Sequence, residues 1–199
     1  MCECWNFVIF VKIFYTMEEV TYGGLTFEPY ITREKIMEQV KRLAREIERD
    51  CEREGEQSPL FLCVLTGAFM FGTDLFRECN IHDAEIAFIR FKSYEGTSSS
   101  GVINEVMGLS EDVEGRYVII VEDIVDTGVT ADQLRAMLAK KNPKKVKMVS
   151  LLFKPESITV GERPEYVGFE IPSKFILGYG LDLDGKARNL NDIYVLKKD

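Results

Sequence analysis

The segment from residue 118 to residue 130, VIIVEDIVDTGVT, constrains the fold of this chain more than any other. It begins as a short apolar run, which is typical of a strand buried on both faces of a parallel sheet. Acids and then small residues follow this run, in the order Glu122, Asp123, Asp126, Thr127, Gly128 and Thr130. An amphipathic stretch at 131–140 comes next and predicts a helix. A strand, an acidic turn and a helix start together indicate a βα unit of an α/β protein.

The expected helix start has the properties of an anion-binding site. The first backbone N–H groups of a helix have no partner within the helix and carry partial positive charge, so a phosphate binds there. The carboxylates before the helix cannot bind that phosphate, but they can accept hydrogen bonds from sugar hydroxyls or act through a bound Mg²⁺. A turn with both features suits a sugar phosphate. The sequence contains neither a Walker A loop nor the dinucleotide fingerprint GxGxxG.

Length and charge exclude several other classes of protein. A chain of 199 residues is long enough for one domain with a substantial core and short for two. The formal net charge is −8, and no stripe of lysine and arginine is present. Because phosphate neutralisation supplies most of the affinity for nucleic acids, we expect no nucleic-acid partner.

The five cysteines predict reduced thiols in a cytoplasmic protein. Cys63 lies in an apolar run and Cys51 on the apolar face of an expected helix, whereas Cys2 and Cys4 have no partners at zinc spacing. The single histidine, His82, lies in a polar turn and is expected to be solvated, which disfavours a histidine-based nucleophile triad.

The N-terminal run at residues 5–15, WNFVIFVKIFY, is the least typical segment. It is too short to cross a bilayer and lacks the features of a signal peptide, so we expect no membrane partner. Three interpretations stay open: an added edge strand, a partner-binding appendage, or translation from a start upstream of Met17. We slightly favour the third and expect one domain over residues 17–199, with 1–16 as an extension.

Strands and helices are expected to alternate along the rest of the chain. A helix starts after Thr32 and fades near 54–58, because apolar residues recur at helical spacing between these points. Further strands are expected at 60–65, 85–92, 102–107, 117–121, 146–152 and 175–179, and further helices at 69–77 and 131–140. This order predicts a parallel sheet whose ligands bind beyond the carboxyl ends of the strands. The acids at 122–126, Thr66-Gly67 and Lys154 all follow such strands.

The segment at 118–130 resembles the phosphoribosyl-pyrophosphate-binding signature of the type I phosphoribosyltransferases. That signature is an apolar strand, two acids, two apolar residues, D-[TS]-[GA], and a Thr or Ser, and every position matches here. The later segments SLLFKPES and VGFEIPSKFILGYGLDLDGKARNLND are similar to the hypoxanthine-guanine members of that family. The resemblance implies an α/β fold with a mainly parallel central sheet, flanking helices, and a small hood built from the termini.

The resemblance implies roles in binding phosphoribosyl pyrophosphate and Mg²⁺. Glu122 and Asp123 would hold the ribose hydroxyls, directly or through Mg²⁺, and Asp182 would hold a metal near the pyrophosphate. Further contacts are implied for Thr66, Gly67, Ile124, Val125, Asp126, Thr127, Gly128, Val129, Thr130 and Arg188. A cis peptide is implied between Leu65 and Thr66, where many relatives have a basic residue in place of the threonine.

The resemblance also implies the purine site. Lys154 would donate to the oxygen at C6, Phe175 would stack on the ring, and backbone groups of Lys174 and Ile176 would meet the ring edge. Asp126 would act as a general base at N7, and Asp182 would also be among the purine-binding residues. The loop at 93–101, with Ser93 and Tyr94 at its stem, would cover the reacting centre as a lid.

Each role has an ordinary structural alternative. Lys154 could be a surface lysine, Phe175 a core residue, Asp182 a solvated turn acid, and Arg188 a member of a surface ion pair. The implied activity is purine salvage from hypoxanthine or guanine, in a homodimer or homotetramer. A xanthine-preferring enzyme and a non-catalytic nucleotide-binding regulator remain as rivals. The presence of Asp126, Lys154, Phe175 and Asp182 argues against the regulator.

Overall fold

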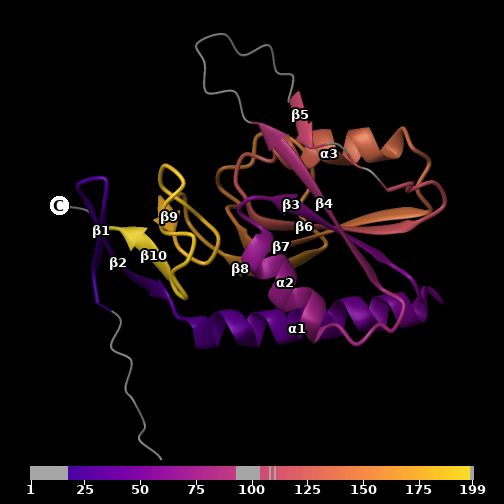
Figure 1. Cartoon of the computed structure of the whole chain (residues 1–199), viewed down its shortest axis with the longest axis horizontal. Helices are drawn as coiled ribbons and strands as arrows, with labels where there is room; N and C mark the ends of the chain where they lie inside the picture. The colour runs from indigo at the N-terminus through magenta and orange to yellow at the C-terminus, as the bar shows by residue number, and fades with distance from the viewer. Residues whose placement is uncertain (1–17, 93–103, 108, 110, 198–199) are drawn as a thin grey trace, which may run out of the picture.

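The protein folds into a central sheet with helices on both faces and a smaller second sheet at one end (Figure 1). The computed structural model describes residues 18–92, 104–107, 109 and 111–197. The N-terminal extension and the whole of the predicted lid at 93–101, including Ser93 and Tyr94, therefore lie outside the described residues.

The central sheet has six strands in the order β5-β4-β3-β6-β7-β8. The strands are β3 (Leu60–Leu65), β4 (Glu85–Lys92), β5 (Asn104–Met107), β6 (Tyr117–Val125), β7 (Lys145–Phe153) and β8 (Tyr166–Glu170). All neighbouring pairs are parallel except β4 and β5. The predicted, mainly parallel sheet is confirmed. The strand of the signature segment is longer than predicted, so that Glu122 and Asp123 belong to β6 and not to the turn.

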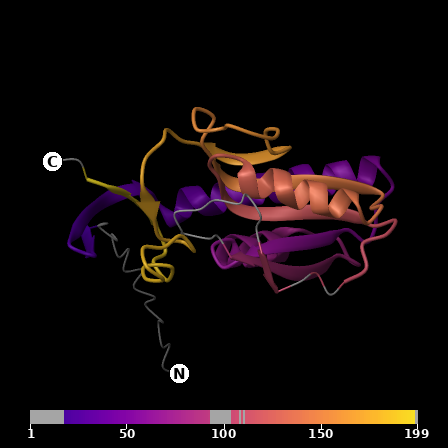
Figure 2. The same ribbon diagram turned by 90° about the horizontal axis from the view of Figure 1, so that it is seen from above.

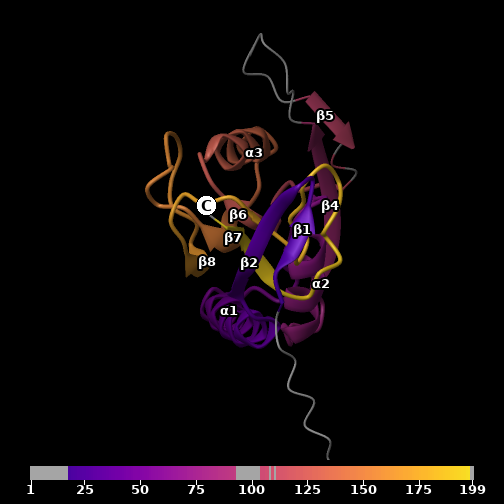
Figure 3. The ribbon, with the colours of Figure 1, turned by 90° about the vertical axis from the view of Figure 1, so that its left-hand side faces the viewer.

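In the described part of the chain, helices cover both faces of the sheet (Figure 3). α1 (Arg33–Arg53) and α2 (Phe69–Glu78) lie on one face and α3 (Val129–Ala139) on the other. Successive side chains of a strand point to opposite faces, and accordingly Ile119 packs in the cluster with α1 and α2 while Ile120 packs with α3. The predicted N-cap of α1 is confirmed, since the Thr32 hydroxyl accepts a hydrogen bond from Lys35 N. Cys51 and Cys63 are buried free thiols, as predicted.

The second sheet is antiparallel, with the order β1-β2-β10-β9, and forms the hood (Figure 2). Its strands are β1 (Val20–Tyr22), β2 (Leu25–Ile31), β9 (Ile176–Leu177) and β10 (Ile193–Leu196). The hood therefore joins the two ends of the described chain, as the resemblance implied. The strands β1, β2, β8 and β10 were not predicted individually. Short strands bounded by turns carry too few residues for a clear periodic pattern.

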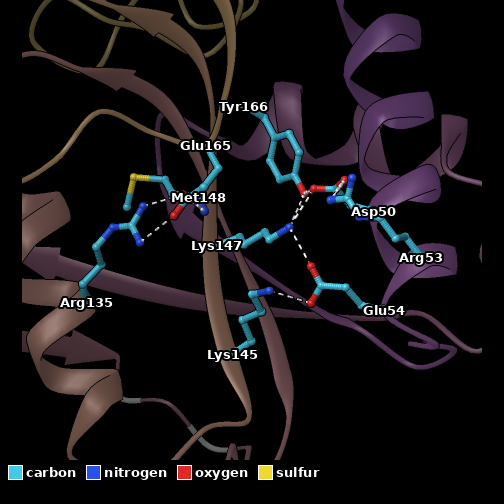
Figure 4. A network of polar contacts seen from close by, with 9 residues as sticks. All are labelled: Asp50, Arg53, Glu54, Arg135, Lys145, Lys147, Met148, Glu165 and Tyr166. Carbon is cyan, nitrogen blue, oxygen red and sulfur yellow. Dashed lines mark hydrogen bonds and ion pairs between the residues drawn. The ribbon is translucent and has the colours of Figure 1, made fainter.

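A polar network ties α1 to the amino-terminal ends of β7 and β8 (Figure 4). Its centre is Lys147, which is only 8% exposed and whose Nζ lies 2.6 Å from Asp50 Oδ2 and 3.1 Å from Glu54 Oε1. The Tyr166 hydroxyl donates to Asp50 as well, at 2.7 Å. Burial lowers the pKa of Lys147, but hydrogen bonds with Asp50, Tyr166 and Glu54 outweigh it and raise the pKa above its usual value. The lysine therefore stays charged in the folded protein.

In the described part of the chain, no helix has both the length and the apolar character that a membrane crossing requires.

The network predicts different costs for two neighbouring lysine substitutions. Lys147→Met leaves Asp50 and Glu54 without their buried cation, and we expect it to lower the free energy of unfolding by about 2–3 kcal/mol. Lys145→Met is the matched control, because Lys145 also pairs with Glu54, at 2.7 Å, but is 44% exposed. An exposed pair contributes less than about 1 kcal/mol. Urea unfolding at pH 7 measures both, and equal losses would contradict a central role for Lys147.

Candidate active site

The signature turn leads from the carboxyl end of β6 into α3, as predicted, although α3 begins two residues earlier than expected. Gly128 is the N-cap of α3 and has a φ of +86°, a conformation that glycine adopts without steric cost. No side chain caps this helix. Since the first N–H groups of a helix need partners from outside it, α3 can offer them to an anion.

The loop after β7 supports this turn from one side. The backbone N–H groups of Thr159 and Val160 donate to the Thr127 carbonyl at 3.0 and 3.3 Å. A Cβ atom added to Gly128 would lie 2.1 Å from the Val160 carbonyl oxygen. The chain can therefore pass this close only with glycine at position 128. The side chains of Thr127, Val129 and Thr130 are exposed.

Two acids at the end of β6 have raised pKa values. Burial raises the pKa of Glu122 well above its usual range, and the neighbouring charge of Asp123 adds to this effect. Burial also raises the pKa of Asp123 to about 6, although backbone hydrogen bonds and the Arg188 guanidinium oppose the rise. One of those bonds runs from Ile124 N to Asp123 Oδ1, at 2.9 Å. These carboxylates are costly to ionise where they stand, which favours a positively charged ligand beside them.

The loop between β3 and α2 is held between Asp123 and the hood. A Cβ atom on Gly67 would lie 1.8 Å from Asp123 Oδ2, and one on Gly180 would lie 2.1 Å from the Gly67 carbonyl oxygen. The Leu65–Thr66 peptide is cis, as the resemblance implied. The close approach of Gly180 to Gly67 was not predicted from the sequence, although glycines on both sides of Tyr179 indicate close backbone contact.

Asp182 and Arg188 are brought together beside this loop. Arg188 Nη2 lies 2.6 Å from Asp182 Oδ1, and Arg188 Nη1 donates to the Gly180 carbonyl at 2.6 Å. Gly185 N donates to the other Asp182 oxygen at 2.6 Å. Both charges act on the pKa of Asp123, so the two residues face the same centre as the acids of β6. The structural alternative for Arg188 was a surface ion pair. Arg188 does form an ion pair, but this pair is partly buried.

The purine residues also lie close to the signature turn. Lys154 Nζ lies 2.6 Å from Asp126 Oδ2, and Lys154 N donates to the Val125 carbonyl. The surface-lysine alternative is wrong, because Lys154 is only 7% exposed. The side chain of Asp126, by contrast, is 44% exposed and available to a ligand. Sequence reasoning named both residues but did not predict that they pair.

The predicted stacking residue, Phe175, is 46% exposed, so the core alternative is wrong. Its ring lies 6.0 Å from the buried ring of Phe27, which supports it from behind. Lys174 is exposed, with Nζ 5.7 Å from the centre of the Tyr30 ring. Ile176 is buried in β9 and pairs with Val195 of β10. The hood thus presents one aromatic face on a rigid support.

The three predicted metal ligands do not form a complete metal site by themselves. In the described part of the chain, no group of three or more His, Cys, Asp or Glu side chains could hold a metal ion. Glu122, Asp123 and Asp182 nevertheless offer carboxylate oxygens, the donors that Mg²⁺ prefers. Because Mg²⁺ is usually bound by one or two carboxylates together with substrate phosphates, these residues fit the predicted role.

Comparisons with known proteins agree on one family. A family profile described as a phosphoribosyl transferase domain matches residues 30–184. The hypoxanthine-guanine phosphoribosyltransferase of Streptococcus pneumoniae is 37% identical over 170 residues, 85% of this chain and 92% of the relative. That of Mycobacterium avium is 39% identical over 179 residues, 88% of each chain.

Solved structures give the same result. A hypoxanthine-guanine phosphoribosyltransferase from Bacillus anthracis is 40% identical, with a TM-score of 0.79 over 85% of this chain and 98% of that one. A hypoxanthine phosphoribosyl transferase from Trypanosoma cruzi is 35% identical, with a TM-score of 0.82 over 89% of this chain and 94% of that one.

The close contact at Gly128 generates a test with a matched control. Gly115 has a similar φ, +67°, but a Cβ added there would meet nothing within 4 Å. Gly115→Ala should therefore lower the free energy of unfolding by only about 1–2 kcal/mol, which is the cost of placing a residue with a Cβ atom at a positive φ. Gly128→Ala adds a clash with a backbone carbonyl that cannot rotate away, and we expect a loss of about 3 kcal/mol or more. Equal losses in chemical denaturation would contradict the contact with Val160.

Proposed function

This chain belongs to the phosphoribosyltransferase family, among the hypoxanthine-guanine phosphoribosyltransferases, and from this we propose its reaction. The protein transfers the phosphoribosyl group of phosphoribosyl pyrophosphate to hypoxanthine or guanine, forming IMP or GMP and releasing pyrophosphate. The observation that carries the choice of base is the buried Lys154 paired with the exposed carboxylate of Asp126 at 2.6 Å.

This pair matches one edge of a 6-oxopurine. The oxygen at C6 and the nitrogen N7 lie side by side on that edge. The Lys154 ammonium has three N–H donors, so it can donate to the oxygen while it keeps its bond to Asp126. Asp126 then faces N7 and accepts the proton that the base loses. Phe175 stacks on the ring, a contact that contributes about 1–3 kcal/mol in comparable sites.

The acids of β6 act on the sugar. During transfer, the bond from the anomeric carbon to pyrophosphate breaks, the bond to the purine nitrogen N9 forms, and positive charge develops on the ribose. In this proposal, Glu122 and Asp123 hold the ribose hydroxyls and stabilise that charge electrostatically. The raised pKa values of both acids support this role, because a positive charge beside them relieves the cost of their burial.

The two phosphate groups bind on opposite sides of these acids. The 5′-phosphate binds at the uncapped start of α3, in the turn 127–130. The pyrophosphate binds to the backbone at Thr66-Gly67 and to Arg188, while Asp182, together with Glu122 or Asp123, would hold Mg²⁺. When bound, Mg²⁺ neutralises charge on the leaving pyrophosphate. Thr66 supplies no positive charge, so Arg188 provides the side-chain cation there.

Further parts of the proposal rest on family membership. Residues 17–199 form a single catalytic domain, and the loop at 93–101, with Ser93 and Tyr94, covers the reacting centre. The enzyme acts in the cytoplasm as a homodimer or homotetramer.

Base choice is the direct test. We expect Mg²⁺-dependent turnover with hypoxanthine and guanine, and a kcat/KM for adenine lower by about 10⁴-fold. Adenine carries an amino donor at C6, which offers the buried Lys154 ammonium no acceptor on the base. Comparable rates with adenine would refute the assignment of Lys154. A preference for xanthine would support the first rival, and nucleotide binding without turnover of any base would support the regulator.

Asp126→Asn tests the general base. Asparagine keeps the shape and an oxygen for Lys154 but cannot take the proton from N7. We expect kcat to fall by about 10²–10³-fold while the dissociation constants of both substrates change little. Asp83→Asn is the control, because it makes the same chemical change at an exposed acid in the turn before β4, at the amino-terminal end of the sheet. A near-native kcat in Asp126→Asn would leave Asp126 with a structural role.

A further inference from the structure

A partly buried polar cluster joins the hood to the helix that follows the pyrophosphate loop. Tyr179, two residues after the end of β9, is 2% exposed, and its hydroxyl donates to Asp74 Oδ2 at 2.7 Å. Asp74 lies on α2, which begins at Phe69, two residues after Gly67. The bond therefore connects a hood segment with the element that carries the pyrophosphate loop.

Two further residues complete the cluster, which we call the Tyr179 cluster: Tyr179, Asp74, Arg33 and Asp192. Arg33, the first residue of α1, has its guanidinium 3.4 Å from Asp74 Oδ2 and 5.8 Å from the centre of the Tyr179 ring. Arg33 N donates to Asp192 Oδ1 at 2.7 Å, and Asp192 is 4% exposed. The cluster thus holds the ends of β2, β9 and β10 against α2.

The hood segment from Tyr179 to Leu190 is closed on itself. Tyr179 N donates to the Leu190 carbonyl at 2.9 Å, and Gly180 N donates to the Arg188 carbonyl at 3.0 Å. Arg188 returns a side-chain bond to the Gly180 carbonyl at 2.6 Å. A segment of this kind shifts as one unit, so an anchor at Tyr179 sets the position of Gly180 against Gly67 and of Arg188 beside the loop.

The base-binding strand is attached differently. β9 pairs with β10 through its backbone, and Leu196 N donates to the Phe175 carbonyl at 2.9 Å. These bonds do not involve the Tyr179 hydroxyl. Loss of that hydroxyl should therefore disturb the pyrophosphate side of the site and leave the stacking face of Phe175 in place.

We propose that Tyr179 is a positioning residue for pyrophosphate binding, acting through Asp74 and the hood segment. This inference rests on the proposed function, in which Gly67 and Arg188 bind pyrophosphate. Tyr179 touches no substrate in this scheme. Its hydroxyl keeps two parts of the pyrophosphate site, one on the central sheet and one on the hood, at a constant separation.

Tyr179→Phe tests the inference by removing one hydroxyl and keeping the ring. With Mg²⁺ present, we expect the KM for phosphoribosyl pyrophosphate and the Kd for inorganic pyrophosphate to rise by about tenfold or more, as expected for the loss of one hydrogen bond to a charged group. The Kd for IMP should change by less than about twofold, since IMP lacks pyrophosphate and keeps the base contacts. Asp74→Asn retains an acceptor for the hydroxyl and should give a smaller rise in the same direction.

Tyr166→Phe is the matched control. Tyr166 is also buried, at 5% exposure, and its hydroxyl donates to a helix aspartate, Asp50, at the same 2.7 Å. It lies at the opposite end of the sheet, so it should lower thermal stability without changing either ligand constant. Unchanged constants in Tyr179→Phe, or equal weakening of IMP and pyrophosphate, would overturn the inference, as would the same shifts in Tyr166→Phe. If the unaltered protein turns over no purine, the proposed function is refuted and not the inference on Tyr179. The two failures can be told apart, because pyrophosphate binding is measured directly and does not depend on turnover.

Discussion

The contact between Gly67, Asp123 and Gly180 is the constraint on which the rest of the site depends. Gly67 lies where any side chain would overlap the Asp123 carboxylate, and Gly180 lies where any side chain would overlap the Gly67 carbonyl. Three segments that are remote in sequence therefore meet at the Gly67 backbone, one through the Asp123 carboxylate and one through Gly180. Because this contact has no room for adjustment, the central sheet and the hood must be positioned accurately by interactions outside it, among them the bond from Tyr179 to Asp74.

Buried charges are compensated by neighbouring groups at one end of the central sheet and only partly compensated at the other. At the amino-terminal ends of β7 and β8, Lys147 is surrounded by Asp50, Glu54 and the Tyr166 hydroxyl, so its charge is compensated within the protein. At the carboxyl end of β6, the charges of Glu122 and Asp123 are only partly compensated, and their pKa values rise. Compensated charge stabilises the fold, whereas uncompensated charge is available to a ligand.

The pairing of Lys154 with Asp126 links base recognition to proton transfer. A buried ammonium held 2.6 Å from a partly exposed carboxylate places a donor and an acceptor on neighbouring atoms of one ligand edge. In the proposed reaction, the group that selects the base also orients the group that removes its proton. Selection and chemistry then depend on the same geometry, because both residues follow neighbouring parallel strands, β6 and β7.

The sequence by itself determined the layered α/β core, the cap of α1 and the acidic turn before α3, because each depends on residues close together in the chain. Thr32 with Lys35, the apolar run at 60–65 and the segment at 118–130 are local patterns of this kind. Only the tertiary structure decided that Lys154 is buried against Asp126, that Gly180 approaches Gly67, and that β10 pairs with β2. These contacts join distant segments, and their geometry follows from how the sheet, the helices and the hood pack together, which no local pattern encodes.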